Sequence, residues 1–209
     1  MNEENIKPKT KSTFREYLEA IIIALLLALF IRTFVVQAFK IPSGSMLNTL
    51  LIGDHILVNK FIYGIKNPVN GSTWIPIKTP ARKDIVVFRY PVNPDQDYIK
   101  RVIGVEGDVV EIKDKKVYVN GELLDEDYTI FLDSKILPAS VQPRDNMGPK
   151  VVPENALFVM GDNRDNSYDS RFWNFVDLKA VKGKAFILYW SWDKENFSVR
   201  FNRIGDLVH

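Results

Sequence analysis

The sequence contains no cysteine among its 209 residues and only two histidines, His55 and His209. The lack of cysteine excludes thiol nucleophiles, thiolate metal sites and disulfide bonds. A Ser-His-Asp triad would have to rely on His55, because His209 is the last residue printed. We therefore expect any nucleophilic serine in this chain to use a base other than histidine, and we assign His55 a structural role.

Charge of one sign is not in excess either. The 28 lysines and arginines nearly balance the 26 aspartates and glutamates, which leaves a net charge of +2. No basic tract is concentrated enough to indicate nucleic-acid binding, so we expect no nucleic-acid partner. Hydrophobic residues make up 46% of the chain, which is enough to fold one domain around a core.

The chain has one long apolar run, and it lies near the N-terminus. The residues from Ala20 to Ile31 read AIIIALLLALFI, twelve apolar residues without interruption. A bilayer span needs about 20 residues. The segment from Tyr17 to Val36 reaches that length if Glu19 and Arg32 extend toward the lipid headgroups. We therefore predict a single transmembrane anchor over residues 17–38, with the lipid bilayer as a partner.

The charges on the two sides of this run predict its orientation. Four basic residues precede it, and fewer follow directly after it: Lys7, Lys9, Lys11 and Arg15, against Arg32 and Lys40. The positive-inside rule then leaves residues 1–16 in the cytoplasm as a short tail and exports the rest of the chain.

A cleaved signal peptide is the alternative interpretation of the same run. Its apolar length is suitable, and Val36-Gln37-Ala38 resembles a cleavage site. The acidic residues Glu3, Glu4 and Glu16 in the tail argue against this alternative, as does Arg32 between the run and the cut. We favour the uncleaved anchor.

Short β-prone runs predict a mostly antiparallel β domain over residues 39–209. Turn residues such as Asn120-Gly121 separate the runs, and most connections are too short for crossover helices. Weaker strand signals and four prolines between Asp125 and Pro153 indicate a loop-rich insertion, within about residues 110–155. The predicted strands are His55–Val58, Ile85–Phe88, Tyr98–Val105, Val109–Ile112, Val117–Val119, Leu157–Met160 and Ala185–Tyr189.

The first stretch that could carry chemistry is Ile41 to Leu50, IPSGSMLNTL. Pro42 and Gly44 favour a tight bend, and Ser43 and Ser45 place two hydroxyl groups on it. Read alone, the stretch is equally typical of an ordinary turn or a helix cap.

The second stretch, DYIKRVIGV from Asp97 to Val105, carries two adjacent cations. As a strand it directs Lys100 and Arg101 to opposite faces. Arg101 stays protonated, whereas burial can lower the pKa of Lys100 until its neutral amine is able to activate a serine. An edge strand whose lysine extends to water is the alternative.

The third stretch, MGDNRDNSYDSR from Met160 to Arg171, is rich in acids but does not fit a calcium loop. An EF-hand starting at Asp162 would have Arg164 as its third residue and Ser167 where glycine is required. We expect no metal and no cofactor. We predict instead an ordered loop that fixes Ser167, in which acids pair with arginines of the same loop: Asp162, Asp165 and Asp169 with Arg164 and Arg171.

Together these stretches resemble type I signal peptidase, the membrane-anchored Ser-Lys endopeptidase family. The match includes, in the family's order, IPSGSMLNTLLIGDHILVNKFIYG, RKDIVVFRYP, DYIKRVIGVEGD and GDNRDNSYDSRFWNFV. The resemblance implies that Ser45 is the nucleophile and Lys100 the general base. It also implies that Ser43 donates to the oxyanion, that Ser167 hydrogen-bonds Lys100, and that two further residues support the loop: Asp169 and Arg171.

The resemblance also implies shallow apolar pockets suited to Ala-x-Ala termini, with the substrate extended as an added strand. The pocket for the residue before the cut would be formed by Ile41, Met46, Leu50, Tyr98 and Ile99. The pocket for the residue two positions further upstream would be formed by Phe39, Ile56 and Val87.

The sequence thus predicts a serine endopeptidase that removes signal peptides from exported proteins. Its expected location is the bacterial cytoplasmic membrane, with the catalytic domain on the outer side. Two alternatives stay open: a specialised Ser-Lys peptidase for one dedicated substrate, and an inactive membrane-anchored domain that binds peptides. The presence of both Ser45 and Lys100 argues against the inactive domain.

Overall fold

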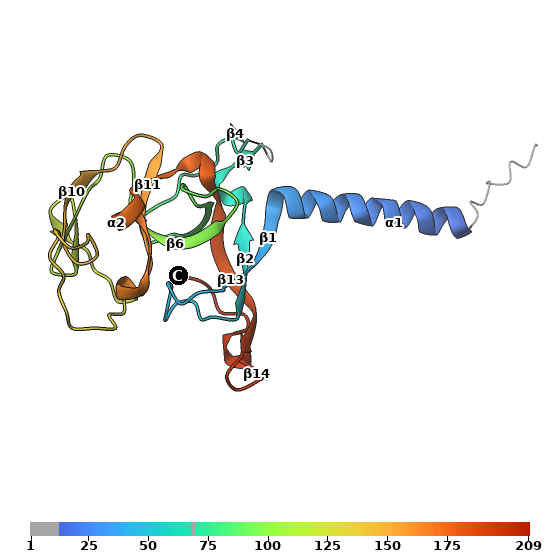
Figure 1. Cartoon of the computed structure of the whole chain (residues 1–209). Helices are drawn as coiled ribbons and strands as arrows, with labels where there is room; N and C mark the ends of the chain where they lie inside the picture. The colour runs from blue at the N-terminus through green and yellow to red at the C-terminus, as the bar shows by residue number, and fades with distance from the viewer. Residues whose placement is uncertain (1–12, 68–69) are drawn as a thin grey trace, which may run out of the picture.

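The computed structural model describes residues 13–67 and 70–209. Most of the predicted cytoplasmic tail therefore lies outside the described residues. A long helix projects from a β domain, as Figure 1 shows. The fold is mostly antiparallel β with one long N-terminal apolar helix, which confirms the predicted fold class.

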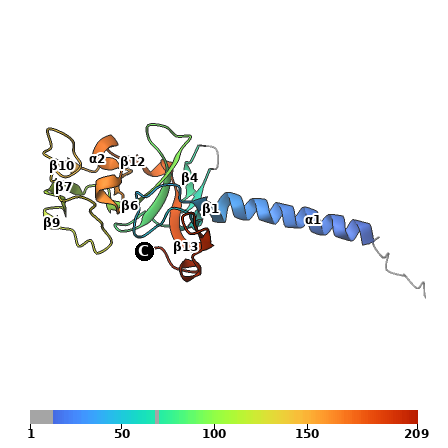
Figure 2. The same cartoon turned by 60° about the horizontal axis from the view of Figure 1, so that its bottom comes forward.

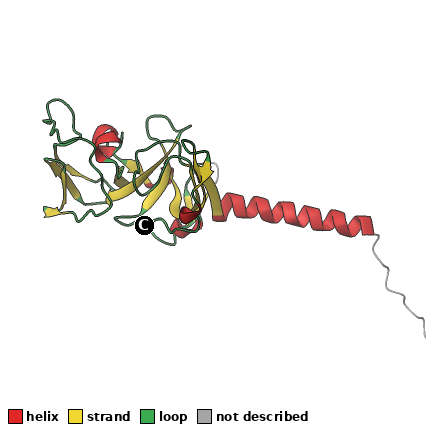
Figure 3. Ribbon diagram, turned by 90° about the horizontal axis from the view of Figure 1, so that it is seen from below, coloured by secondary structure: helices red, strands yellow, loops and turns green. Residues whose placement is uncertain are grey.

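The apolar helix α1 runs from Thr13 to Phe30 and continues as a π-helical turn, Ile31–Val35. None of its residues is buried, and the helical segment Thr13–Val35 is long and apolar enough to cross a membrane. Figure 3 shows it standing clear of the strands. The predicted anchor extended to residue 38, whereas the chain becomes strand β1 at Val36.

Strand β1 changes the interpretation of the possible cleavage site. Val36, Gln37 and Ala38 pair with Asn59, Val58 and Leu57 of strand β2. A cut after Ala38 would remove three of the five residues of β1 from the sheet. The paired strand therefore argues for a continuous chain from the helix into the β domain.

The main sheet has eight strands in the order β1-β2-β13-β5-β6-β11-β12, with β14 paired to β13. All of its strand pairs are antiparallel. Its bounds are β1 Val36–Lys40, β2 Asp54–Asn59, β5 Ile85–Arg89, β6 Asp97–Gly104, β11 Ala156–Met160, β12 Val176–Asp177, β13 Val181–Asp193 and β14 Ser198–Val199. A short helix α2, Ser170–Trp173, follows β11.

Two smaller sheets complete the domain. Strands β10-β7-β8-β9 form a four-stranded sheet at the end of the domain far from α1 (Figures 1 and 2). Strands β3 and β4 form a hairpin close to the junction of α1 and β1. Their bounds are β3 Ile65–Lys66, β4 Thr73–Ile75, β7 Val109–Lys113, β8 Lys116–Val119, β9 Glu122–Leu123 and β10 Met147–Val151.

All seven predicted strands are present, with ends that differ by a few residues. The short strands β3, β4, β9, β12 and β14 were not predicted, because two or three residues carry too little pattern. Strand β10 was missed inside the insertion predicted as loop-rich. Its sequence Met147–Val151 contains a glycine and a proline, which normally weaken a strand signal, and its pairing with β7 has an irregular register.

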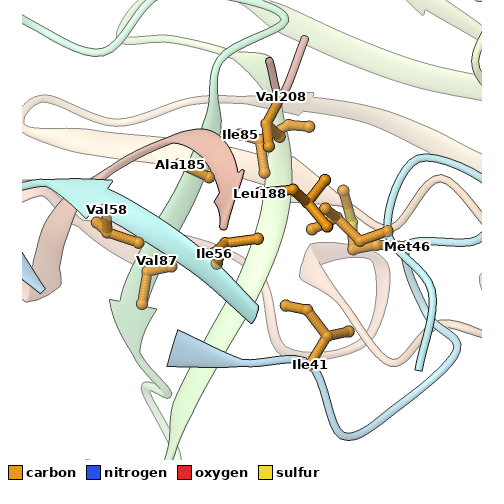
Figure 4. Close-up of a cluster of buried hydrophobic side chains, with 10 residues drawn as sticks. Ile41, Met46, Ile56, Val58, Ile85, Val87, Ala185, Leu188 and Val208 are labelled. Atoms are coloured by element: carbon orange, nitrogen blue, oxygen red, sulfur yellow. The ribbon is translucent and has the colours of Figure 1, made fainter. Parts of the chain in front are cut away.

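Three clusters of buried apolar side chains form the core. One of them packs β2, β5 and β13 against the chain that follows β1, and Figure 4 shows its side chains converging. Its members include Ile41, Met46 and Leu50, which flank the two candidate serines. Burial of these three side chains holds the serine-bearing turn onto the sheet.

Candidate active site

The turn that carries Ser43 and Ser45 lies between β1 and β2. Its base is closed by hydrogen bonds from Ile41 N to Asp54 O, 2.8 Å, and from Gly53 N to Ile41 O, 3.0 Å. Gly53 has a φ of +95°, and a Cβ there would lie 2.1 Å from Trp192 O. Glycine is required at this position because the backbone passes so close to β13.

Lys100 projects from β6 toward this turn. Its Nζ donates hydrogen bonds to Ser45 Oγ at 2.7 Å and to the Ile99 carbonyl at 3.0 Å. Strand β6 pairs with β5 on one side and β11 on the other, and Lys100 is only 4% exposed. The alternative of an edge-strand lysine extending to water is therefore wrong.

Burial determines the protonation of Lys100. Loss of solvation lowers the pKa of its amine to about 8, with a smaller contribution from the positive charge of Arg171. The negative charges of Asp169 and Asp162 act in the opposite direction. The neutral amine is thus accessible within about one pH unit of neutrality, which an ordinary lysine does not allow.

The loop after β11 clamps the serine turn through its backbone. Asn163 N donates to Ser45 O at 3.1 Å, and Asn163 Nδ2 donates to Gly44 O at 2.9 Å. Gly161 makes this approach possible, since a Cβ there would lie 2.4 Å from Ser45 O and 2.3 Å from Ser167 Oγ. Sequence reasoning missed Asn163 and Gly161, although a glycine before a conspicuous polar run is a signal of close backbone contact.

Only one of the ion pairs predicted within this loop is formed. Arg171 binds Asp169 through two hydrogen bonds of 2.8 Å, and both side chains are buried. Burial alone would raise the pKa of Asp169, but the Arg171 charge, with hydrogen bonds from Arg171 and the Gly161 amide, holds that pKa below its usual range. Asp169 also caps α2 by accepting from Arg171 N.

The other charged residues of the loop pair with residues outside it, which corrects the prediction. Asp162 binds Arg101, Asp165 binds Lys115, and Arg164 binds Glu126. Each of these three side chains reaches a partner on another segment of the chain. The loop is therefore tied to β6 and to the segment between β7 and β10.

Ser167 lies in the site, but the hydrogen bond expected between Ser167 and Lys100 is not formed. Its Oγ is buried and has no hydrogen-bond partner. Ser167 lies near Asp169 and helps to hold the pKa of that carboxyl low. The two bonds of Lys100 to Ser45 and Ile99 take the place of the expected contact.

An open cleft of about 600 Å³ is lined by the two serines and the lysine. It contains Ser43, Ser45, Lys100 and Ser167 together, as the sequence predicted. Six lining residues were not among the predicted site residues: Gly44, Gln142, Asp165, Asn166, Tyr168 and Phe172. His55 is not among the lining residues, and its ring packs on Tyr189 with 5.8 Å between centroids.

Most of the residues predicted to form the substrate pockets do not line the cleft. Among the eight residues expected to contact substrate, only Tyr98 lines the cleft. Phe39 and Ile99 are half-buried at the border of the core. The other five have at most 2% of their surface exposed and belong to one packed core cluster: Ile41, Met46, Leu50, Ile56 and Val87.

A metal site is not evident in the part of the chain that the structure describes. Residues 13–67 and 70–209 contain no group of three or more acidic or histidine side chains arranged to hold an ion. The acids nearest the cleft are already engaged by arginine or lysine, as the pairs of Asp162, Asp165 and Asp169 show.

A serine hydroxyl bonded to a buried lysine amine in an open cleft is the arrangement of a serine hydrolase that uses lysine as its base. The family model "Signal peptidase, peptidase S26" matches residues 14–190. The chain therefore belongs to the signal peptidase family, peptidase S26. With its N-terminal apolar helix, it is a membrane-anchored member.

Two sequence relatives agree with this assignment. A "Signal peptidase I" of Pseudomonas aeruginosa is 40% identical over 93% of this chain and 79% of its own length. One of Aquifex aeolicus is 36% identical over 85% of this chain and 84% of its own. A solved signal peptidase I from Enterococcus faecalis is 35% identical and covers 51% of this chain and 97% of its own, with a TM-score of 0.41.

The burial of Lys100 should be visible in stability as a function of pH. Its pKa falls from 10.5 to about 8 on folding. Between these values the unfolded chain holds a proton that the folded chain has released, so wild-type stability rises with pH. Lys100→Met lacks this rise. We therefore expect the free energy of unfolding of the wild type to rise by about 3 kcal/mol relative to that of Lys100→Met between pH 7 and 10.5.

The measurement is chemical unfolding of the full chain in detergent micelles at several pH values. The matched control is Lys116→Met, which removes an exposed lysine from strand β8. Because this variant keeps Lys100, it should keep the wild-type rise of stability with pH. The same rise in Lys100→Met would contradict the lowered pKa.

Proposed function

We propose that the protein removes N-terminal signal peptides from exported proteins, with Ser45 as the nucleophile and Lys100 as the general base. The observation that carries this proposal is the 2.7 Å hydrogen bond between Lys100 Nζ and Ser45 Oγ within a solvent-open cleft. Membership of the signal peptidase family supports the choice of substrate.

The reaction begins when the neutral amine of Lys100 accepts the Ser45 proton as Oγ attacks the scissile carbonyl carbon. The carbonyl oxygen becomes an oxyanion, to which the Ser45 amide and the Ser43 hydroxyl donate. Lys100 then gives its proton to the departing amine, and the peptide bond breaks. Water, deprotonated by Lys100, releases the signal peptide from Ser45 and restores both groups.

Ser167, Asp169 and Arg171 act as positioning residues in this scheme. The Arg171–Asp169 pair fixes the loop, and the unpaired hydroxyl of Ser167 stays available to turn toward the Lys100 amine during the reaction. A buried polar atom without a partner normally costs stability, so its retention at this place fits a role in the reaction cycle.

The close packing of the core around the serine turn accounts for a preference for small residues. Met46, Leu50 and Ile56 are completely buried, and a close-packed core does not yield to a large side chain without strain. A methyl group needs little displacement. We therefore assign Ala-x-Ala selectivity to this packed core, which the half-buried Phe39 and Ile99 border, together with Tyr98 in the lining of the cleft.

The charge distribution around α1 supports an orientation with residues 1–16 in the cytoplasm and the β domain on the outer side of the bacterial membrane. In that orientation the cleft faces the compartment into which signal peptides deliver their proteins. The lipid bilayer and the signal peptides of exported precursors are then its two partners.

Cleavage of a generic exported precursor tests the proposed function. The full chain in lipid vesicles should release the mature protein with an alanine directly before the cut. Ser45→Ala should lower the turnover number by at least about 10⁴-fold, since no other nucleophile replaces the hydroxyl. A matched control is Ser198→Ala, which removes an exposed hydroxyl in β14 and should keep full activity.

Cleavage of one precursor and of no others would favour the specialised peptidase. Binding of the precursor without cleavage by the wild type would favour the inactive domain. Full activity of Ser45→Ala would contradict the assignment of the nucleophile.

The pH dependence of kcat/KM tests the role of Lys100. Only the neutral amine accepts the serine proton, so activity should rise with pH, reach half its maximum near the Lys100 pKa of about 8, and fall about tenfold per unit below it. Assays between pH 6 and 10 measure this limb, with Lys116→Gln as the control. A midpoint near 10.4, the value of an unperturbed lysine, would contradict the proposal.

Ser43→Ala tests the oxyanion assignment. A donor that acts in the transition state contributes mainly to turnover, so kcat should fall about 100- to 1000-fold while KM changes little. Steady-state kinetics on a precursor peptide separate the two constants. A raised KM with unchanged kcat would make Ser43 a substrate-binding residue.

A further inference from the structure

A second cavity lies away from the candidate active site, where the transmembrane helix joins the sheet. Its volume is about 230 Å³, room for several water molecules at about 30 Å³ each or for one phosphate group. Thr33 and Phe34 of the π-helical turn form one wall, and Gln37 of β1 continues it. No residue of the serine turn or of the polar loop lines this cavity.

The lining of this cavity is strongly basic. It includes five cations from four separate parts of the chain: Lys60, Lys66, Arg89, Lys179 and Lys182. Two of these five cations have an acidic side chain nearby. Lys182 Nζ donates to Asp97 at 2.6 Å, and Asp177 acts on Lys66. Lys66 donates to the backbone carbonyls of Leu178 and Val181.

Three of the five cations have no acidic partner within residues 13–67 and 70–209. Lys60 donates only a long hydrogen bond, 3.4 Å, to Arg32 O, and the side chains of Arg89 and Lys179 form no ion pair. Burial lowers the pKa of Lys60, and the positive charges of Lys182 and Arg32 lower it further. The cations therefore repel one another, and an anion between them would relieve that repulsion.

The position of the cavity indicates where such an anion comes from. Thr33 and Phe34 lie at the end of the segment that is long enough to cross the bilayer. The β3–β4 hairpin beside it exposes Trp74 and Ile75, which are 57% and 55% exposed. Tryptophan next to apolar residues is typical of the membrane–water interface. Lipid headgroups are the phosphate-bearing molecules found at that depth.

We propose that this cavity binds the phosphate of an anionic phospholipid headgroup, with Lys60 and Arg89 as its main donors. Arg89 can bind phosphate oxygens through two parallel hydrogen bonds, and Lys60 adds a point charge. A bound lipid would hold the β domain at a fixed height and rotation relative to the bilayer. The inference is independent of the proposed peptidase mechanism.

Native mass spectrometry of the full chain, released from dodecyl maltoside micelles, tests the proposal. The micelles contain phosphatidylglycerol, phosphatidylcholine with the same acyl chains, or inorganic phosphate without lipid. We expect one phosphatidylglycerol per chain to be retained at concentrations where phosphatidylcholine is not. Lys60→Gln/Arg89→Gln should weaken this retention about 30-fold, since each basic residue near a membrane surface contributes about a factor of five.

The matched control is Lys116→Gln/Lys135→Gln. It removes the same charge from exposed lysines of β8 and of the segment between β9 and β10, and it should retain the lipid within about twofold of the wild type. Melting of each variant without lipid checks its fold. If the double variant melts lower, Lys60→Gln alone should still weaken retention about fivefold.

Equal retention of phosphatidylglycerol by the wild type and the cavity variants would overturn the proposal. Loss of retention in the control variant to the same extent would also overturn it, because the effect would then come from net charge. Binding of inorganic phosphate that depends on Lys60 and Arg89, without retention of phosphatidylglycerol, would overturn the assignment to lipid.

Discussion

The buried ion pair between Arg101 and Asp162 joins the three parts of the candidate active site. Arg101 follows Lys100 in β6, and Asp162 follows β11 and also accepts a hydrogen bond of 2.6 Å from Thr49 in the serine turn. Both charges are almost completely buried, at 2% and 0% exposed. Desolvation of such a pair is costly, but the bidentate geometry and further bonds from Arg101 to the carbonyls of Lys83 and His209 offset the cost. Loss of either partner would leave a buried charge alone, so the pair specifies how the turn sits on β6.

The adjacent cations of β6 have different surroundings, and this difference allows Lys100 to act as a base. Arg101, which stays charged, receives a carboxylate in direct contact. Lys100 receives a hydroxyl and a carbonyl, and the two nearby acids act on it only at longer range. The negative charge of Asp169 is itself largely balanced by the positive charge of Arg171. A carboxylate in direct contact would restore an ordinary pKa to Lys100. That carboxylate, Asp162, binds the neighbouring Arg101 instead.

The helix and the candidate nucleophile are close in the chain. Helical backbone ends at Val35, β1 runs to Lys40, and Ser45 follows within the next turn. Because β1 is hydrogen-bonded to β2 along its whole length, this connection is rigid rather than a free linker. The covalent tether sets the distance of the cleft from the bilayer, and the basic cavity lies at the same junction of helix and sheet.

The sequence by itself determined the apolar helix, seven of the strands and the meeting of Ser43, Ser45, Lys100 and Ser167 in one cleft. The first two follow from local hydrophobic pattern, and the third from four long blocks whose order and spacing are specific to a family.

Only the tertiary structure decided which acid binds which cation. The sequence placed Asp162 and Arg164 in one loop network, whereas they bind Arg101 and Glu126, which lie 61 and 38 residues away along the chain. It also decided that Ile41, Met46 and Leu50 lie buried in the core, and that cations from four segments surround one cavity. Ion pairs and burial depend on the direction of each side chain after the strands have paired, and no local pattern contains that direction.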